Sequence, residues 1–132
     1  MPVPALSRAA FDGDGRLAGL AQSWPVTLMA ADGGRHDLVL VGPVAVAATM
    51  RGHGLGQRLM TAILGAADQS GARALMLVGD PEFYGRFGFS ATATAGWEMP
   101  GPVERRRLLA RLNGITLPHQ GRLVPFAPVL DV

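Results

Sequence analysis

Apolar and polar stretches alternate along the first part of the chain in a pattern typical of β-strands joined by tight turns. Ala5–Phe11 and Arg16–Met29 are the extended stretches, and they are followed by the polar clusters Asp12–Gly15 and Asp32–Arg35. These clusters are rich in Asp and Gly, which favour turns. Because proline cannot donate a hydrogen bond to a neighbouring strand, we expect Pro25 to lie at a sheet edge or at a bulge. The pattern predicts an antiparallel meander.

The middle of the chain predicts a strand, a helix and a second strand. Leu38–Ala47 and Ala72–Gly79 are nearly all apolar, as in strands buried on both faces, and Gly42-Pro43 predicts a bulge in the first. The pattern becomes helical from Gly54, and Gly71 stands where a C-terminal cap belongs. The expected core positions of this helix recur at spacings of three and four: Leu55, Leu59, Ala62 or Ile63, and Ala66. Together these segments form a βαβ unit with a right-handed crossover.

The last third of the chain has one ambiguous segment. A short turn of helix is expected from Asp80-Pro81 through Tyr84. Pro102 and Asn113-Gly114 would fit the start and end of a helix over Gly101–Leu112. The same Asn-Gly pair also fits the turn of a β-hairpin, so the local pattern leaves both open.

Composition narrows the classes of protein to consider. The 132 residues predict one domain, and 48% hydrophobic against 17% charged residues excludes intrinsic disorder. All basic residues are arginines, which raise the pI to 10.4 although the net charge is only +2, and no aromatic residues interleave with Arg105–Arg107. We therefore expect no nucleic-acid partner. The absence of cysteine excludes disulfides and thiolate chemistry. No apolar run suits a signal peptide or a membrane span, so we expect a cytoplasmic protein without a membrane partner.

The segment Pro43–Gln57 carries the clearest chemical signal. It runs from a buried strand through a short turn into a helix, with Gly52, Gly54 and Gly56 at alternate positions. The first N–H groups of a helix have no internal acceptor, and the helix dipole adds partial positive charge there. Glycines allow a ligand to approach those groups, and Arg51 adds a cation. The segment is suited to holding a phosphate or a diphosphate.

Two familiar phosphate loops do not match this segment, whereas a third motif does. Gln57 stands where G-x-G-x-x-G needs its last glycine, and a chain without lysine has no P-loop. Arg51, Gly54 and Gly56 instead match R/Q-x-x-G-x-G/A, the acyl-CoA motif of the GNAT N-acetyltransferase superfamily. The stretch Gly79–Phe89 is similar to the G-D-P-x-Y-Y-x-R-F-G-F segment of one bacterial branch of that superfamily.

This resemblance implies a fold and a set of cofactor contacts. The implied fold is α/β (α+β), with a mixed, mostly antiparallel sheet, a βαβ unit and a strand within Gly101–Leu112. The implied acyl donor is acetyl-coenzyme A, with no metal. Main-chain groups of Val44, Ala45 and Val46 would hold its pantetheine arm. Its diphosphate would lie on the amides of the Gly-rich turn, comprising Arg51, Gly52, His53, Gly54, Leu55, Gly56 and Gln57.

The resemblance also implies direct attack of a neutral amine on the thioester. A main-chain N–H near Val46 would stabilise the oxyanion, and Tyr84 would protonate the departing thiolate. We interpret Asp80 as a helix N-cap and Glu82 as a first-turn acid, with amine orientation or base catalysis as the alternative. His53 is expected to contribute its backbone rather than its ring.

The chain departs from the family at its N-terminus. Family members have a first strand and two helices before the meander, but only about ten residues precede the Asp12–Gly15 turn here. The acceptor half of the site is therefore the uncertain half, and three explanations stay open: a truncated reading frame, a homodimer that completes the site, or a non-catalytic acyl-CoA sensor or scaffold. No motif specifies the amine acceptor.

Overall fold

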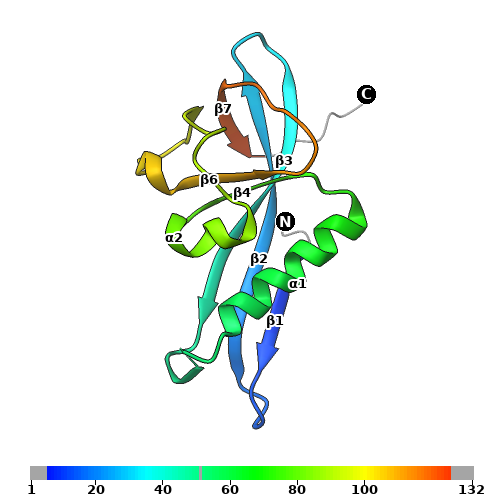
Figure 1. Cartoon of the computed structure of the whole chain (residues 1–132), viewed down its shortest axis with the longest axis vertical. Helices are drawn as coiled ribbons and strands as arrows, with labels where there is room; N and C mark the ends of the chain where they lie inside the picture. The colour runs from blue at the N-terminus through cyan, green and yellow to red at the C-terminus, as the bar shows by residue number, and fades with distance from the viewer. Residues whose placement is uncertain (1–5, 51, 126–132) are drawn as a thin grey trace.

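A curled sheet forms the centre of the computed structural model, which describes residues 6–50 and 52–125 (Figure 1). Its seven strands among these residues are β1 (Arg8–Phe11), β2 (Leu17–Ala30), β3 (Arg35–Val46), β4 (Ala74–Val78), β5 (Gly96–Glu98), β6 (Leu108–Leu112) and β7 (Gln120–Pro125). Their order is β5-β7-β2-β3-β4-β6, and β1 pairs with β2. Only β3–β4 and β5–β7 are parallel pairs. The predicted mixed, mostly antiparallel sheet is confirmed.

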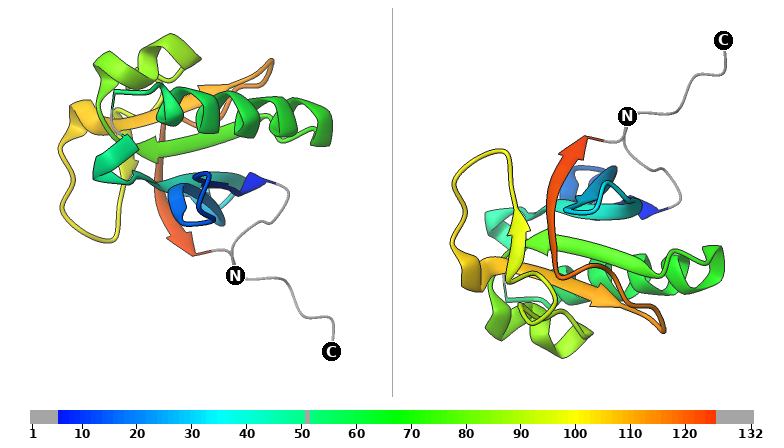
Figure 2. Two further views of the ribbon diagram at one scale, coloured as in Figure 1. Left: turned by 90° about the horizontal axis from the view of Figure 1, so that it is seen from below. Right: turned by 90° about the horizontal axis from the view of Figure 1, so that it is seen from above.

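The described helical segments are few. They are α1 (Leu55–Ser70), α2 (Pro81–Tyr84) and the 3-10 turns η2 (Ala48–Met50), η3 (Gly85–Phe87) and η4 (Arg105–Arg107). Figure 1 and Figure 2 show the start of α1, the η2 and η4 turns and α2 along the same side of the molecule. This side holds the alternate glycines Gly52, Gly54 and Gly56, which the sequence indicates for ligand binding.

The long strand β2 changes its partner along its length. It pairs with β3 throughout, while its other side pairs with β1 up to Ala21 and with β7 from Val26. Between these partners the N–H of Ser23 donates to the Ser7 hydroxyl oxygen at 3.1 Å. Pro25 lies in this same stretch, where β2 has no strand partner on that side among residues 6–50 and 52–125. The predicted edge position is therefore correct, but a bulge at Pro25 is wrong, since its pairing with β3 is in register.

The βαβ unit forms as the sequence predicts. Strands β3 and β4 are parallel neighbours in the sheet, and α1 connects them along the chain. Gly71 caps the helix in the left-handed conformation, with φ of 78°. The predicted bulge is present, because Gly42-Pro43 of β3 faces only Gln22 of β2.

The core face of α1 differs in part from the prediction. Its buried residues are Leu55, Leu59, Met60, Ile63 and Ala67. Ala62 is exposed and Ala66 only half-buried. The apolar stripe continues in steps of four along the helix, so it reaches Ala67 instead of Ala66.

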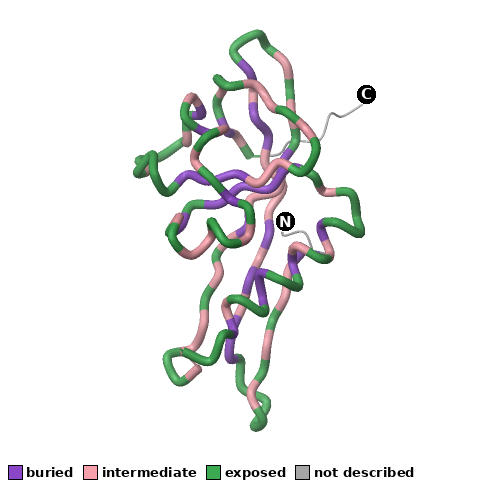
Figure 3. Tube along the Cα trace, viewed as in Figure 1, coloured by how far each residue is buried: buried purple, intermediate pink, exposed green. Residues whose placement is uncertain are grey.

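Burial on both faces holds for β4 but not for the whole of β3. Leu75 and Leu77 of β4 pack under α1, while Ala74 and Met76 face the second core cluster on the other side of the sheet. In β3 the part after Val41 is half-buried or exposed, as Figure 3 shows in pink and green. The prediction of burial for that part is wrong, because it borders a cleft instead of a packed layer.

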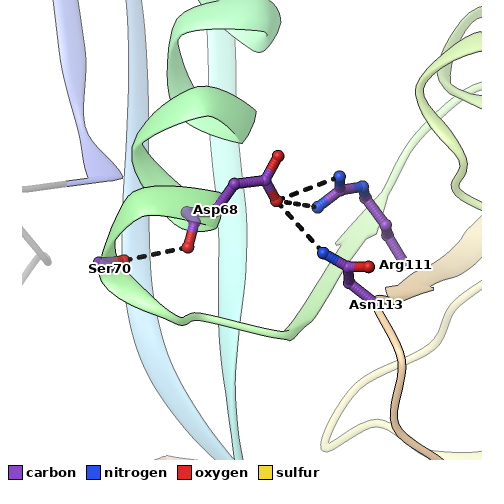
Figure 4. Close-up of polar contacts among 5 residues, drawn as sticks. Asp68, Ser70, Arg111 and Asn113 are labelled. Carbon is purple, nitrogen blue, oxygen red and sulfur yellow. Dashed lines mark hydrogen bonds and ion pairs between the residues drawn. The ribbon is translucent and has the colours of Figure 1, made fainter.

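The ambiguous segment contains a strand, as the resemblance implies. β6 pairs with β4, and Asn113-Gly114 does not form a hairpin, since the chain after β6 does not pair back onto it. Instead the N–H of Asn113 donates to the carbonyl of Arg73 at 2.8 Å. Asp68 of α1 accepts from Arg111 at 3.4 Å and from the Asn113 side chain at 3.4 Å (Figure 4). These contacts hold the C-terminal end of α1 against β6.

Candidate functional site

The site is a cleft that opens where β3 and β4 separate. The two strands share two residue pairs, Val39 with Leu75 and Leu40 with Met76, and then diverge. β4 continues against β6, whereas β3 continues against β2. Because a parallel ladder is lost at this point, the edge of β3 from Gly42 onward faces the cleft without a strand partner among the described residues.

The cleft has two connected parts. The first, the turn pocket, has a volume of about 500 Å³ and lies between the end of β3, the Gly-rich turn and the start of α1, with Phe83, Tyr84 and Arg86 opposite. The second, the wedge pocket, has a volume of about 570 Å³ and lies between β3 and the end of β4, closed by α2 and Arg107. Val44, Phe83 and Tyr84 line both parts, so the two parts adjoin each other.

Glycine is required at the Gly-rich turn for two different reasons. Gly52 and Gly54 have φ of 84° and 71°, which side-chain-bearing residues rarely adopt. Gly56 has an ordinary helical backbone, but a Cβ atom there would lie 3.7 Å from Phe83 Cζ and 3.9 Å from Val46 Cγ2. A larger side chain at this position would therefore extend into the turn pocket.

The start of α1 presents unpaired N–H groups to this pocket. Those of Gly56 and Gln57 donate no hydrogen bond to another described residue. No acidic side chain lies in the first turn, so the positive end of the helix dipole is not compensated there. The arrangement is suited to an anion, as predicted. Arg51 lies outside the described residues, and His53 is exposed.

Of the three residues predicted to contact the pantetheine arm, only two turn their main-chain groups toward the open edge of β3. Ala47 donates its N–H to the carbonyl of Ala18 on β2 at 2.7 Å. Main-chain groups alternate in direction along a strand, so Ala45 also faces β2, while Val44 and Val46 face the cleft. Val44 and Val46 line the turn pocket, whereas Ala45 does not. The geometry therefore supports two of the three as ligand contacts.

Tyr84 lies where the two pockets meet. Its ring packs so closely on the Gly79 backbone that a Cβ atom there would lie 2.4 Å from Tyr84 Cε2. Phe83 packs edge-on against it, with ring centroids 4.9 Å apart. Burial raises the pKa of the phenol, against the opposing charge of Arg107. The hydroxyl is therefore protonated at neutral pH, and it hydrogen-bonds to no other described residue.

Asp80 and Glu82, the acidic residues beside Tyr84, have the helix-capping and first-turn positions expected from the sequence. Asp80 caps α2 by accepting from the Glu82 N–H at 3.0 Å. The pKa of Asp80 is lowered, first by a hydrogen bond with the Glu82 side chain and then by that backbone bond. Glu82 pairs with Arg106 at 2.6 Å. Asp80 also lines the wedge pocket, so its cap role leaves it available to a ligand.

Sequence reasoning misses three residues of the cleft. Phe83 and Arg86 lie beside Tyr84 in the recognised motif, and the guanidinium of Arg86 lies 5.0 Å from the centre of the Phe83 ring. Phe83 and Arg86 are three residues apart, so in a helical turn they share a face, and this spacing could have indicated that they lie together. Arg107 is different, because only the pairing of β6 with β4 brings it to the cleft. No local signal reveals that pairing.

Other chemistries find less support in the described residues. They contain no group of three or more His, Asp or Glu side chains placed to hold a metal ion. None of the helices described here has the length and apolar character needed to cross a membrane.

Comparisons with known proteins point to one family. The model of the acetyltransferase (GNAT) domain matches residues 6–92. An uncharacterized N-acetyltransferase of Streptomyces avermitilis is 36% identical over 85% of this chain and 27% of its own length. YhbS, an uncharacterized N-acetyltransferase of Escherichia coli, is 34% identical over 67% of this chain and 51% of its own. The chain thus spans about half of YhbS and about a quarter of the Streptomyces protein.

Solved structures show the same fold. The crystal structure of E. coli YhbS in complex with CoA has a TM-score of 0.70 and 27% identity, over 89% of this chain and 64% of that one. A GNAT acetyltransferase of Brucella melitensis in complex with acetyl-CoA has a TM-score of 0.68 and 28% identity, over 92% of this chain and 66% of that one.

Proposed function

Because the chain belongs to the acetyltransferase (GNAT) family, we propose that it binds acetyl-CoA in this cleft and transfers the acetyl group to an amine. One observation carries the proposal: the unpaired amides of α1, the open edge of β3 and Tyr84 border two pockets that share the lining residues Val44, Phe83 and Tyr84. The CoA and acetyl-CoA complexes of the two solved relatives support it.

The proposed binding mode follows from the groups available. The diphosphate accepts hydrogen bonds from the N–H groups at the start of α1, with Arg86 as a nearby cation. The pantetheine amides pair with Val44 and Val46 in the manner of an added strand. The thioester then reaches the wedge pocket beside Tyr84.

The proposed reaction is a direct acyl transfer. The amine nitrogen attacks the thioester carbonyl, the main-chain N–H near Val46 stabilises the oxyanion, and the C–S bond breaks as the C–N bond is completed. The nitrogen loses a proton to water, and the Tyr84 hydroxyl gives its proton to the thiolate. Solvent then reprotonates the tyrosinate.

Two measurements test this function separately. Calorimetric titration with acetyl-CoA should show binding that a non-acylated, phosphate-free pantetheine lacks. Turnover with a panel of amines should release CoA, which a thiol reagent detects without background because the chain contains no cysteine. Absence of acetyl-CoA binding would contradict the whole proposal. Binding without turnover of any amine would indicate the non-catalytic module instead.

The packing of Tyr84 on Gly79 gives a first prediction. Gly79→Ala places a Cβ atom against the edge of the Tyr84 ring, closer than van der Waals contact allows, so the ring must move. We expect a loss of about 1–3 kcal/mol of stability in urea unfolding and a lower kcat for acetyl transfer. Gly85→Ala is the matched control, because its Cβ meets nothing within 4 Å and its backbone is ordinary helix. Equal kcat in the two variants would show that the position of the ring does not matter.

A further inference from the structure

One of the residues that line the wedge pocket is an arginine without an ion-pair partner among the described residues. Arg105, Arg106 and Arg107 are consecutive, but they have different partners. Arg105 donates to the carbonyl of Trp97, and Arg106 pairs with Glu82. The guanidinium of Arg107 forms no hydrogen bond or ion pair with any residue of 6–50 or 52–125, and it is exposed. Of the three, Arg107 is the one available to a ligand.

The backbone of Arg107 is fixed at this place. Its carbonyl accepts a hydrogen bond from the N–H of Gly79 at 2.9 Å, and its own N–H donates to the carbonyl of Glu104 at 3.0 Å. These bonds hold the residue at the end of β4, directly beside the point where the thioester is proposed to enter. The Arg107 backbone is therefore held by hydrogen bonds at both its N–H and its carbonyl. Its side chain lines the pocket from the side of β6.

An opposite charge lines the same pocket. Asp80 accepts the Glu82 N–H with its Oδ1 atom to cap α2, and its carboxylate also interacts with the Glu82 side chain. Arg107 and Asp80 both line the wedge pocket and form no ion pair with each other. The hydrogen bonds with Glu82 lower the pKa of Asp80 most, and the charges of Arg106 and Arg107 lower it further.

From this placement we propose that the wedge pocket selects a zwitterionic acceptor, an α-amino acid, by pairing its carboxylate with Arg107 and its amino group with Asp80. The inference rests on the proposed acetyl transfer. A guanidinium binds a carboxylate through two parallel hydrogen bonds, which a neutral amide cannot reproduce. The neighbouring amine, which attacks after losing its proton to water, is then held between Asp80 and the thioester beside Tyr84. Amines without a carboxylate, such as polyamines, leave Arg107 unpaired.

Matched sets of acceptors test the selection. Each set contains an α-amino acid, its amide and the amine formed by removing the carboxylate. We expect the amino acid to exceed both others in kcat/KM by about 2–5-fold, the effect of losing one solvent-exposed charged pair. Arg107→Met should remove this preference while leaving the Kd for acetyl-CoA unchanged. Arg106→Met removes the same charge one residue away and should keep the preference.

Several outcomes would overturn the inference. They are equal kcat/KM across each set, an equal loss for all acceptors in Arg107→Met, or a weaker Kd for acetyl-CoA in that variant. Titration of amino acids into the CoA complex gives a second measurement that needs no turnover. Arg107-dependent binding supports the inference, and absence of binding contradicts it. Failure of acetyl-CoA binding itself would overturn the proposed function instead.

Discussion

Replacing Tyr84 by phenylalanine is expected to lower kcat for acetyl transfer by about 10²–10⁴-fold, the range typical of a lost general acid. The hydroxyl makes no hydrogen bond to another described residue, so the fold loses no polar contact. The ring still packs on Gly79 and against Phe83 and Phe89, with centroids 6.2 Å from Phe89. We therefore expect unchanged thermal stability and an unchanged Kd for acetyl-CoA, measured by calorimetry. Equal losses in kcat and in affinity would show that Tyr84 only packs.

The dependence of kcat on pH distinguishes a general-acid role of Tyr84 from a structural role. Burial raises the pKa of Tyr84, and only the protonated phenol can donate to the thiolate. kcat should therefore hold at neutral pH and fall as the pH rises through that pKa, above the usual range for tyrosine. The decrease at high pH should be absent from the residual activity of Tyr84→Phe. A decrease that persists in the variant would belong to another group.

The parts of the fold that could be predicted are those determined by neighbouring residues. The meander follows from Asp-Gly turns between apolar stretches, and the βαβ unit follows from a strand pattern that becomes helical at Gly54. The bulge at Gly42-Pro43 follows from the missing donor of proline. Each of these signals acts over a few residues, so the sequence displays it directly.

The parts that could not be predicted depend on pairing between distant segments. The apolar run of β3 reads as fully buried, yet β4 leaves it after Leu40 and exposes the rest to the cleft. Asn113-Gly114 fits both a helix end and a hairpin turn, and only the pairing of β6 with β4 decides between them. This second pairing brings Arg107 to the wedge pocket. Alternation along β3 also decides that Ala45 faces β2, which composition alone does not reveal.

The backbone conformation of each glycine determines which of them best tests the phosphate site. Gly54 is part of the recognised motif, but its φ of 71° means that any side chain there strains the backbone by about 1–2 kcal/mol. A loss of binding in a Gly54 variant would mix folding with ligand approach. Gly56 has ordinary helical geometry, so a side chain there changes the pocket without straining the turn.

Gly56→Leu is therefore expected to weaken acetyl-CoA binding by about 100-fold, since overfilling a packed site costs about 1–3 kcal/mol. Its Cβ fits beside Phe83 and Val46, but the remaining carbons must enter the turn pocket, where the diphosphate is proposed to lie. Leucine favours helix over glycine by about 0.8 kcal/mol, so the fold should not weaken. Gly65→Leu makes the same change in the same helix, where a Cβ meets nothing within 4 Å, and should bind acetyl-CoA normally. Calorimetry that gave both variants the wild-type Kd would place the diphosphate elsewhere, because no ligand held by the first amides of α1 can share that space with a leucine side chain.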